Sequence, residues 1–256
     1  MTLIDRMMST MESISYYGSW FPAFLAFFGL LYVIGRTLFF RSWTPRQRLV
    51  ASSCFISLFH GSPAAILGAS AILTHPVRGF AFPNSDFQNL VLDYSVAYFT
   101  IDLLHLILIR GDPLFIAHHV ATLFVFVTCR YVAAHGAFAL LVLLVLAEVT
   151  SFCQNVWTLA GARKADSPVA ANVYKLVSPL FYSMYTLMRV FAGPWFFYKM
   201  SAFYLSGKAN DVIPKWIAIS WIVVVGGAIS VSILWISNHW AALFSEKKGN
   251  SDKKER

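Results

Sequence analysis

YSVAYFTIDLLHLILIRGDPLFIAHH, residues 94–119, is the stretch of sequence that decides the fold. It has the hydropathy of two membrane helices joined by a tight Gly-Asp-Pro turn. It nevertheless carries Asp102, His105, His118 and His119 at depths where side chains that face lipid are apolar. A charged side chain at mid-bilayer costs about 2.5–3.5 kcal/mol on insertion scales, so it usually faces the interior of a helix bundle. The stretch therefore predicts two membrane helices that line a polar interior.

The composition of the whole chain agrees with a membrane protein. The 256 residues are 58% hydrophobic and only 12% charged, whereas a soluble domain has about 25% charged residues. The formal net charge of +8 does not point to nucleic acid, because the basic residues lie in interhelical loops and in the tail. The three cysteines, Cys54, Cys129 and Cys153, lie in apolar segments without a CxxC pair, so we expect neither a disulfide framework nor a structural zinc knuckle.

Seven apolar segments are each close to the roughly 20 residues that a membrane-spanning helix needs. The first is too long for the core of a signal peptide and is expected to remain as a helix. The loops are short, so we expect one all-α, polytopic bundle with no module outside the membrane. The predicted helices cover residues 18–39, 49–73, 88–109, 114–134, 136–159, 173–198 and 215–241.

The basic residues outside the helices are unevenly distributed between the two sides of this predicted bundle. Thirteen lie on the side that carries the C-terminus and six on the other, while Arg189 lies within a helix. Cytosolic loops carry the excess of Lys and Arg. The expected topology has a luminal N-terminus and a cytosolic C-terminus.

Polar side chains form stripes on several of the predicted helices at steps of three and four residues, which is one helical face. Lipid cannot satisfy such groups, so the stripes should share one interior. Hydroxyls and Asn155 usually join helices by hydrogen bonds. Arg189 needs a partner, which could be Glu148, Asp102 or the anion of a substrate. Asp93 is expected to be solvated or to cap a helix. The stripes are Ser53, Ser57 and His60; Tyr94, Tyr98, Asp102 and His105; Glu148, Ser151, Asn155 and Thr158; and Ser178, Tyr182, Tyr185 and Arg189.

The adjacent histidines beside an aspartate suggest acid–base chemistry. A neutral imidazole can accept a proton from a hydroxyl or amine that attacks an acyl carbon, and a carboxylate can orient the imidazole. A buried cavity poor in water suits acyl transfer, because water would hydrolyse the donor. There is no GxSxG nucleophile motif and no HExxH or HxxHH cluster. His60, His105 and the His118–His119 pair, on three helices, leave convergence on a metal ion open.

Four motifs occur in order along the chain: YFTIDLLHL (98–106), IAHHVATLFVF (116–126), LLVLAEVTSFCQNVW (143–157) and LMRVFAGPWFFYK (187–199). Together they resemble the TLC domain, the family of ceramide synthases, translocating-chain-associating proteins and many smaller members. The resemblance covers about residues 46–244. Ceramide synthases follow the His pair with a His-Asp and a second Asp, but here the region reads ALLVLLVLAEV, so the smaller members are the closer match.

The resemblance implies that helices two to seven form the TLC bundle around a lipid-sized cavity. It matches His118 and His119 to the paired histidines of the proposed catalytic site of ceramide synthases, and Asp102 to the Asp of the aromatic-rich third-helix motif. We expect these three residues to be catalytic, with no metal and no bound cofactor. We therefore expect transfer of a fatty acyl group from acyl-CoA or a phospholipid to a lipid amine or hydroxyl, with membrane lipids as the partners. The supporting or substrate-binding residues would be Tyr98, His105, Glu148, Asn155, Tyr185 and Arg189.

Two other classes of function are compatible with the same sequence. The first is a non-enzymatic protein of lipid sensing, lipid homeostasis or cargo trafficking that uses the same cavity. The second is a metal-dependent lipid amidase.

The last residues resemble a localisation signal. Lys253 and Lys254 stand at the fourth and third positions from the C-terminus, as in the dilysine signal that returns proteins to the endoplasmic reticulum. Such a signal would be read by cytosolic coat proteins. The expected organisation is a luminal N-terminus with the first helix (1–45), the TLC domain (46–244) and a charged cytosolic tail (245–256).

Overall fold

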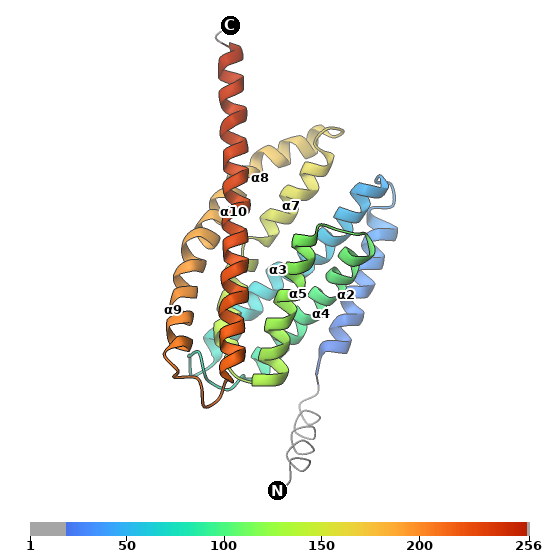
Figure 1. Ribbon diagram of the computed structural model, residues 1–256. Helices are drawn as coiled ribbons and strands as arrows, with labels where there is room; N and C mark the ends of the chain where they lie inside the picture. The colour runs from blue at the N-terminus through green and yellow to red at the C-terminus, as the bar shows by residue number, and fades with distance from the viewer. Residues whose placement is uncertain (1–18, 255–256) are drawn as a thin grey trace.

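A computed structural model describes the backbone of residues 19–254 and the side chains of residues 19–243. The described chain is a bundle of helices, three of which continue into short π-helical segments (η), and no strands beyond a single β-bridge occur in this part. The elements are α2 (Phe21–Ile34), η1 (Gly35–Phe39), α3 (Pro45–Thr74), α4 (Asp86–Leu108), α5 (Pro113–Val127), η2 (Thr128–Ala133), α6 (Ala137–Glu148), α7 (Ser151–Arg163), α8 (Pro168–Thr186), η3 (Leu187–Ala192), α9 (Gly193–Leu205) and α10 (Lys215–Lys254) (Figure 1).

Six of the helical segments are long and apolar enough to cross a membrane. The all-helical multi-pass architecture predicted from the sequence is therefore confirmed. The sixth expected helix, residues 173–198, belongs to the α8–η3–α9 run, which extends along the bundle (Figure 1) but is not among these six apolar segments. Lys175, Arg189 and several hydroxyl groups lower its hydropathy.

The helix expected over residues 136–159 is divided in two. α6 ends at Glu148 and α7 begins at Ser151, with a turn at Val149 and Thr150 between them. The turn separates Glu148 from Ser151, the first two residues of the polar stripe predicted for this segment.

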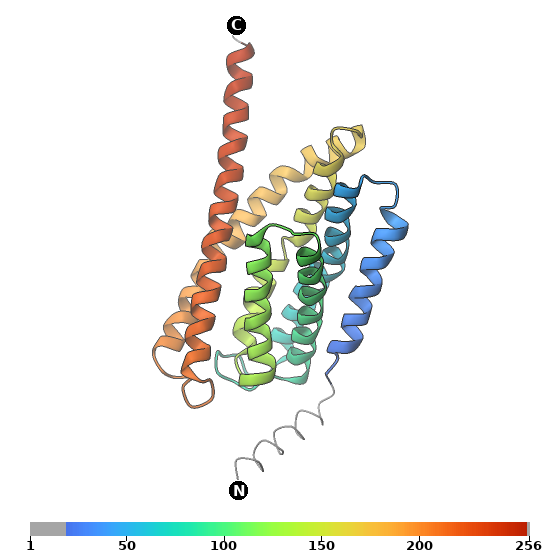
Figure 2. The ribbon, with the colours of Figure 1, turned by 45° about the vertical axis from the view of Figure 1, so that its right-hand side comes forward.

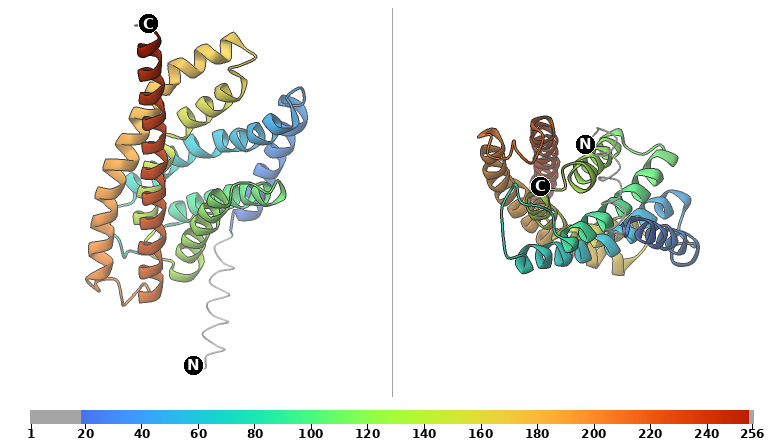
Figure 3. Two further views of the ribbon diagram at one scale, coloured as in Figure 1. Left: turned by 45° about the horizontal axis from the view of Figure 1, so that its top comes forward. Right: turned by 90° about the horizontal axis from the view of Figure 1, so that it is seen from below.

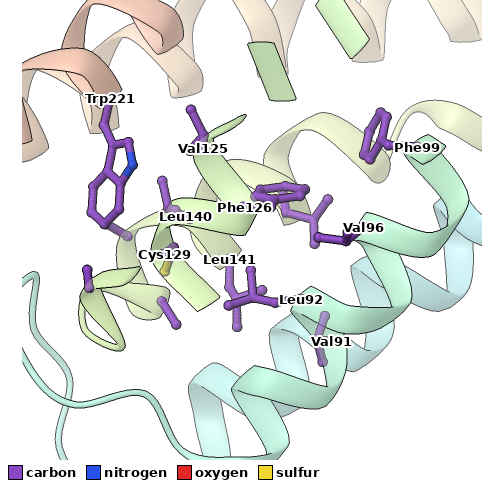
Figure 4. Packing of buried hydrophobic residues seen from close by; sticks show 14 of the residues in the cluster. Val91, Leu92, Val96, Phe99, Val125, Phe126, Cys129, Leu140, Leu141 and Trp221 are labelled. Atoms are coloured by element: carbon purple, nitrogen blue, oxygen red, sulfur yellow. The ribbon is translucent and has the colours of Figure 1, made fainter. Parts of the chain in front are cut away.

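α4 is the central helix of the bundle. It packs against α2, α3, α5 and α6, and its span is the most buried of the six. The views in Figures 2 and 3 show α2 on one flank of this arrangement and α9 with α10 on the other. The apolar core beside α4 joins side chains such as Leu92, Val96 and Phe99 to Phe126 and Leu141 of the neighbouring helices (Figure 4).

Local sequence explains how α4 reverses into α5. Arg110 adopts φ 52°, and the amide of Gly111 donates to the carbonyl of Leu106 at 2.8 Å, which is the Schellman pattern that ends a helix. The carboxylate of Asp112 then accepts from the amide of Leu114 at 2.8 Å, and Pro113 occupies the first turn of α5. The Gly-Asp-Pro turn predicted from the sequence therefore sets α5 antiparallel beside α4.

Asp93 corrects one expectation. Its side chain is only 1% exposed rather than solvated. It accepts hydrogen bonds from Arg130 (3.0 Å), from Tyr131 (2.8 Å) and from the backbone amide of Trp20 at the start of α2 (3.0 Å). A buried carboxylate needs such partners, and these partners join α2 and η2 to α4.

Candidate functional site

A cavity of about 130 Å³ opens between α4, α5, α6, η3, α9 and α10. Its polar wall consists of His118, Thr122, Glu148 and Arg189, and most of the remaining lining is leucine, valine, phenylalanine and isoleucine. Pockets for drug-sized ligands have about 300–1,000 Å³. The cavity is therefore smaller than the lipid-sized space expected, and it has room for a head group with a short piece of chain.

Asp102 and His119 form a buried pair between α4 and α5. Nε2 of His119 lies 2.9 Å from Oδ2 of Asp102, and Nδ1 of His119 lies 2.8 Å from the carbonyl oxygen of Phe115. Ser53 of α3 donates to the other carboxylate oxygen at 2.8 Å. A carbonyl only accepts hydrogen bonds, so Nδ1 carries a proton, and one further proton is shared between Nε2 and Oδ2. Both ring nitrogens of His119 are therefore occupied.

His118 has different surroundings, although it is the next residue. It lies on the cavity wall, and its ring is 5.6 Å from that of His119 at 82°. Its imidazole makes no hydrogen bond to any residue in the described part of the chain; only its backbone carbonyl accepts one, from Thr122 at 2.9 Å. Consecutive residues of a helix point about 100° apart, which is why one histidine meets α4 and the other meets the cavity.

Glu148 is held at the end of α6 by the helix break described above. The hydroxyl of Ser151 donates to its Oε2 at 2.5 Å, and Nδ1 of His60 lies 3.9 Å from the same oxygen. His60 is 0% exposed, stacks on Tyr98 at 4.0 Å and contacts Ser95 through Nε2 at 3.2 Å. Polar side chains thus extend from Glu148 on the cavity wall through His60 to Ser95 of α4.

His60 and Ser151 were not among the site residues predicted from the sequence. The sequence did contain a signal for them, because both residues belong to the polar stripes. The stripes do not reveal that Gly61 lets α3 lie close to Glu148 and Ser151: a Cβ on Gly61 would lie 2.5 Å from Cβ of Ser151 and 2.9 Å from Oε2 of Glu148.

Arg189 does not make the ion pair that the sequence suggested. Its guanidinium donates to the carbonyl oxygen of Ala147 at 3.2 Å and lies 5.3 Å from the ring centre of Tyr185. Among the described residues, no carboxylate oxygen lies within 4.0 Å of it, neither from Glu148 nor from Asp102. The Oε2 atom of Glu148 is directed to Ser151 instead.

The remaining predicted site residues lie around this centre rather than on the cavity wall. His105 faces α2, where its Nδ1 is 2.8 Å from the hydroxyl of Tyr32. Asn155 donates to Ser57 at 2.9 Å and so joins α7 to α3. Tyr185 belongs to an aromatic cluster with Trp235 and Phe181.

The histidines do not converge as a metal site would require. Within the described residues, no three His, Cys, Asp or Glu side chains come together in a group that could hold a metal ion. This arrangement gives the metal-dependent amidase reading no geometric support.

The bundle, its central Asp–His pair and the cavity beside it define a multi-pass helical membrane protein with a polar interior. The family model described as TLC domain matches residues 50–241, and the chain belongs to the TLC domain family. An Arabidopsis thaliana protein, TLC domain-containing protein At5g14285, is 56% identical over 241 residues, which is 92% of this chain and 95% of that protein. No solved structure matches the chain.

Proposed function

We propose that this protein transfers acyl groups between membrane lipids, with His118 as the general base. The observation that carries the proposal is the position of His118, on the wall of a largely apolar cavity and with no hydrogen-bonded partner for its ring in the described chain. A general base needs a free nitrogen that faces the substrate. His119, which the sequence offered as an equal candidate, has none.

The proposed step balances without a cofactor. The hydroxyl or amine of a lipid acceptor attacks the carbonyl carbon of the acyl donor, and the new oxygen–carbon or nitrogen–carbon bond forms. The bond to the leaving group breaks, which is a thiolate if the donor is acyl-CoA and an alkoxide if it is a phospholipid. His118 takes the proton of the acceptor and returns it to the leaving group. The apolar lining keeps water from competing with the acceptor.

The Asp102–His119 pair would act as a positioning element in this step. It fixes the first turns of α5 against α4, and this packing sets the rotation of α5 that places His118 at the cavity. Neither residue of the pair then needs to contact the substrate.

Turnover in reconstituted vesicles tests the assignment. The full chain is incorporated into phosphatidylcholine vesicles with labelled palmitoyl-CoA and a total lipid extract as the acceptor source, and labelled lipid products are counted per folded molecule. His118→Ala should lower the rate about 10²–10⁴-fold, while His75→Ala, a change in the loop after α3 and away from the cavity lining, should leave it unchanged. Full turnover by folded His118→Ala would refute the role of this residue.

A non-enzymatic lipid-binding protein is the second candidate. The observation in its favour is that no side chain in the described part of the protein orients His118 in the way that a carboxylate orients a catalytic histidine. Lipid that co-purifies with the wild type, together with no product from either donor class, would favour this candidate.

We also propose residence in the endoplasmic reticulum. The support is the dilysine of Lys253 and Lys254, whose side chains lie outside the described residues. Coat proteins can read this signal only on a cytosolic tail, so the proposal depends on the topology that is tested below.

A further inference from the structure

Arg189 is a partly buried cation whose hydrogen-bond donors are only partly satisfied by the described chain. A guanidinium has five N–H donors, and one hydrogen bond, to the carbonyl of Ala147, is made within the described residues. Its Nε is buried and has no hydrogen-bond partner among residues 19–243. Contact with the face of Tyr185 compensates only part of the charge.

Arg189 lies far from both ends of its helical run. It lies near the middle of the α8–η3–α9 run, about 24–32 Å from either end at about 1.5 Å per residue. The side chain lines the cavity. The free donors of the guanidinium therefore need an acceptor in or beside that space.

The two nearby carboxylates are engaged with other groups. Asp102 is bonded to His119 and Ser53, and its pair with His119 is neutral overall, whichever atom holds the shared proton. Glu148 accepts from Ser151 and lies close to His60. No basic group other than His118 stands beside Arg189 on the cavity wall. The wall thus presents unused donors at Arg189 and a free imidazole at His118.

We infer that Arg189 binds the anionic head of a single-chain lipid whose apolar chain enters the cavity. The head is a carboxylate or a phosphate, since both match the forked donors of a guanidinium. The chain lies against Leu140 and Leu144 of α6 and against Val224 and Ile229 of α10, which line the same space. The inference names the class of ligand for the cavity in which we propose acyl transfer. It rests on the proposed function only in assuming that this cavity is the site of ligand binding.

The π-helical segment η3 explains how Arg189 reaches this position. The amide of Gly193 donates to the carbonyl of Met188, five residues earlier, and Pro194 follows with no amide hydrogen of its own. A Cβ on Gly193 would lie 3.0 Å from that carbonyl oxygen. π-Helical segments inside α-helices are frequent at functional sites, and this one directs Arg189 between α6 and α10.

Binding to ligands that differ only in the head group tests the inference. The full chain in neutral phosphatidylcholine nanodiscs is titrated with tritiated palmitate, hexadecyl phosphate and hexadecanol. We expect palmitate or the phosphate to bind at least tenfold more tightly than the alcohol, and the tighter of the two identifies the head. Arg189→Gln should remove that preference, whereas Arg189→Lys should keep part of it. Arg78→Gln, which changes an exposed loop arginine, is the matched control.

Two outcomes would overturn the inference. One is equal affinity of the wild type for palmitate, hexadecyl phosphate and hexadecanol, which is informative even if the Arg189 variants do not fold. The other is a head-group preference that survives in folded Arg189→Gln. The two proposals can fail independently. If His118→Ala retains full turnover but the head-group preference depends on Arg189, the catalytic proposal fails and the anion site stands. If His118→Ala loses turnover but the wild type shows no head-group preference, the catalytic proposal stands and the anion site fails.

Discussion

The two neighbouring histidines differ in their hydrogen bonds: both ring nitrogens of His119 have partners, whereas the ring of His118 has none among the described residues. Nδ1 of His119 donates to the carbonyl of Phe115, so its Nε2 is the only atom of the ring that can change its proton in the pair with Asp102. An asparagine at position 102 could still accept from Ser53 with its oxygen and donate to Nε2 with its nitrogen. The two partners of this pair are therefore not equivalent towards mutation.

The first prediction follows from that asymmetry. Asp102→Asn should cost only about 1 kcal/mol of stability, because one hydrogen bond replaces another. His119→Ala should cost about 3–5 kcal/mol, because it leaves a carboxylate buried with Ser53 alone. Unfolding of the purified variants in mild detergent measures both, with His75→Ala as the control. A larger loss in Asp102→Asn would contradict the proton assignment.

At this scale the sequence identified which residues are polar and interior, but not their partners. The spacing placed Asp102 and the two histidines near each other. It could not decide which histidine meets Asp102, because that depends on the rotation of α5 about its axis. The expected Glu148–Arg189 pair was wrong, because the turn at Val149 and Thr150 brings Ser151 to the carboxylate.

At the scale of helices, α3 packs closely against the break between α6 and α7 because residue 61 is a glycine. Gly61 faces the helix break, where a Cβ would meet Ser151 at 2.5 Å and Glu148 at 2.9 Å. Gly227 of α10 offers a matched position, since a Cβ there would meet no atom within 4 Å.

The second prediction compares alanine at these two glycines. Gly61→Ala should destabilise the protein by about 1–3 kcal/mol, the usual cost of forcing atoms into a packed interior. Gly227→Ala should be neutral or stabilise the helix by up to about 1 kcal/mol. Thermal unfolding of both variants under one detergent condition gives the comparison. Equal effects would mean that α3 can move away from the break at little cost.

Hydropathy predicted the order of the helical segments better than their interruptions. Six of the seven expected segments correspond to helices long and apolar enough to cross a membrane, but the π-helical segments and the break between α6 and α7 were not foreseen. Average hydropathy reports how deeply a segment lies in the membrane. It contains no information on a local change in helical register, which arises from residues such as Gly193 and Pro194.

At the scale of the whole molecule, the described ends of the bundle lie on opposite sides. The start of α2 is at one end and the C-terminal part of α10 projects from the other (Figure 1). We expect such an arrangement from an odd number of crossings, in which the α8–η3–α9 run is a further crossing beside the six long apolar segments.

The third prediction is therefore a luminal N-terminus and a cytosolic C-terminus. In sealed microsomes, protease should remove a C-terminal epitope tag and leave an N-terminal one intact, because the excess of Lys and Arg marks the cytosolic side. Addition of detergent should expose both tags and serves as the control. Equal protection of the two tags would mean an even number of crossings, and protection of the C-terminal tag would also exclude dilysine retrieval.

The double attachment of α2 has a consequence for synthesis. α2 emerges from the ribosome before α4, but two of its hydrogen-bonded contacts lie on α4: the carboxylate of Asp93 accepts from the amide of Trp20, and His105 meets Tyr32. At about 5–20 residues per second, several seconds pass between the synthesis of α2 and that of α4. Until Asp93 and His105 are made, the amide of Trp20 and the hydroxyl of Tyr32 lack these two partners.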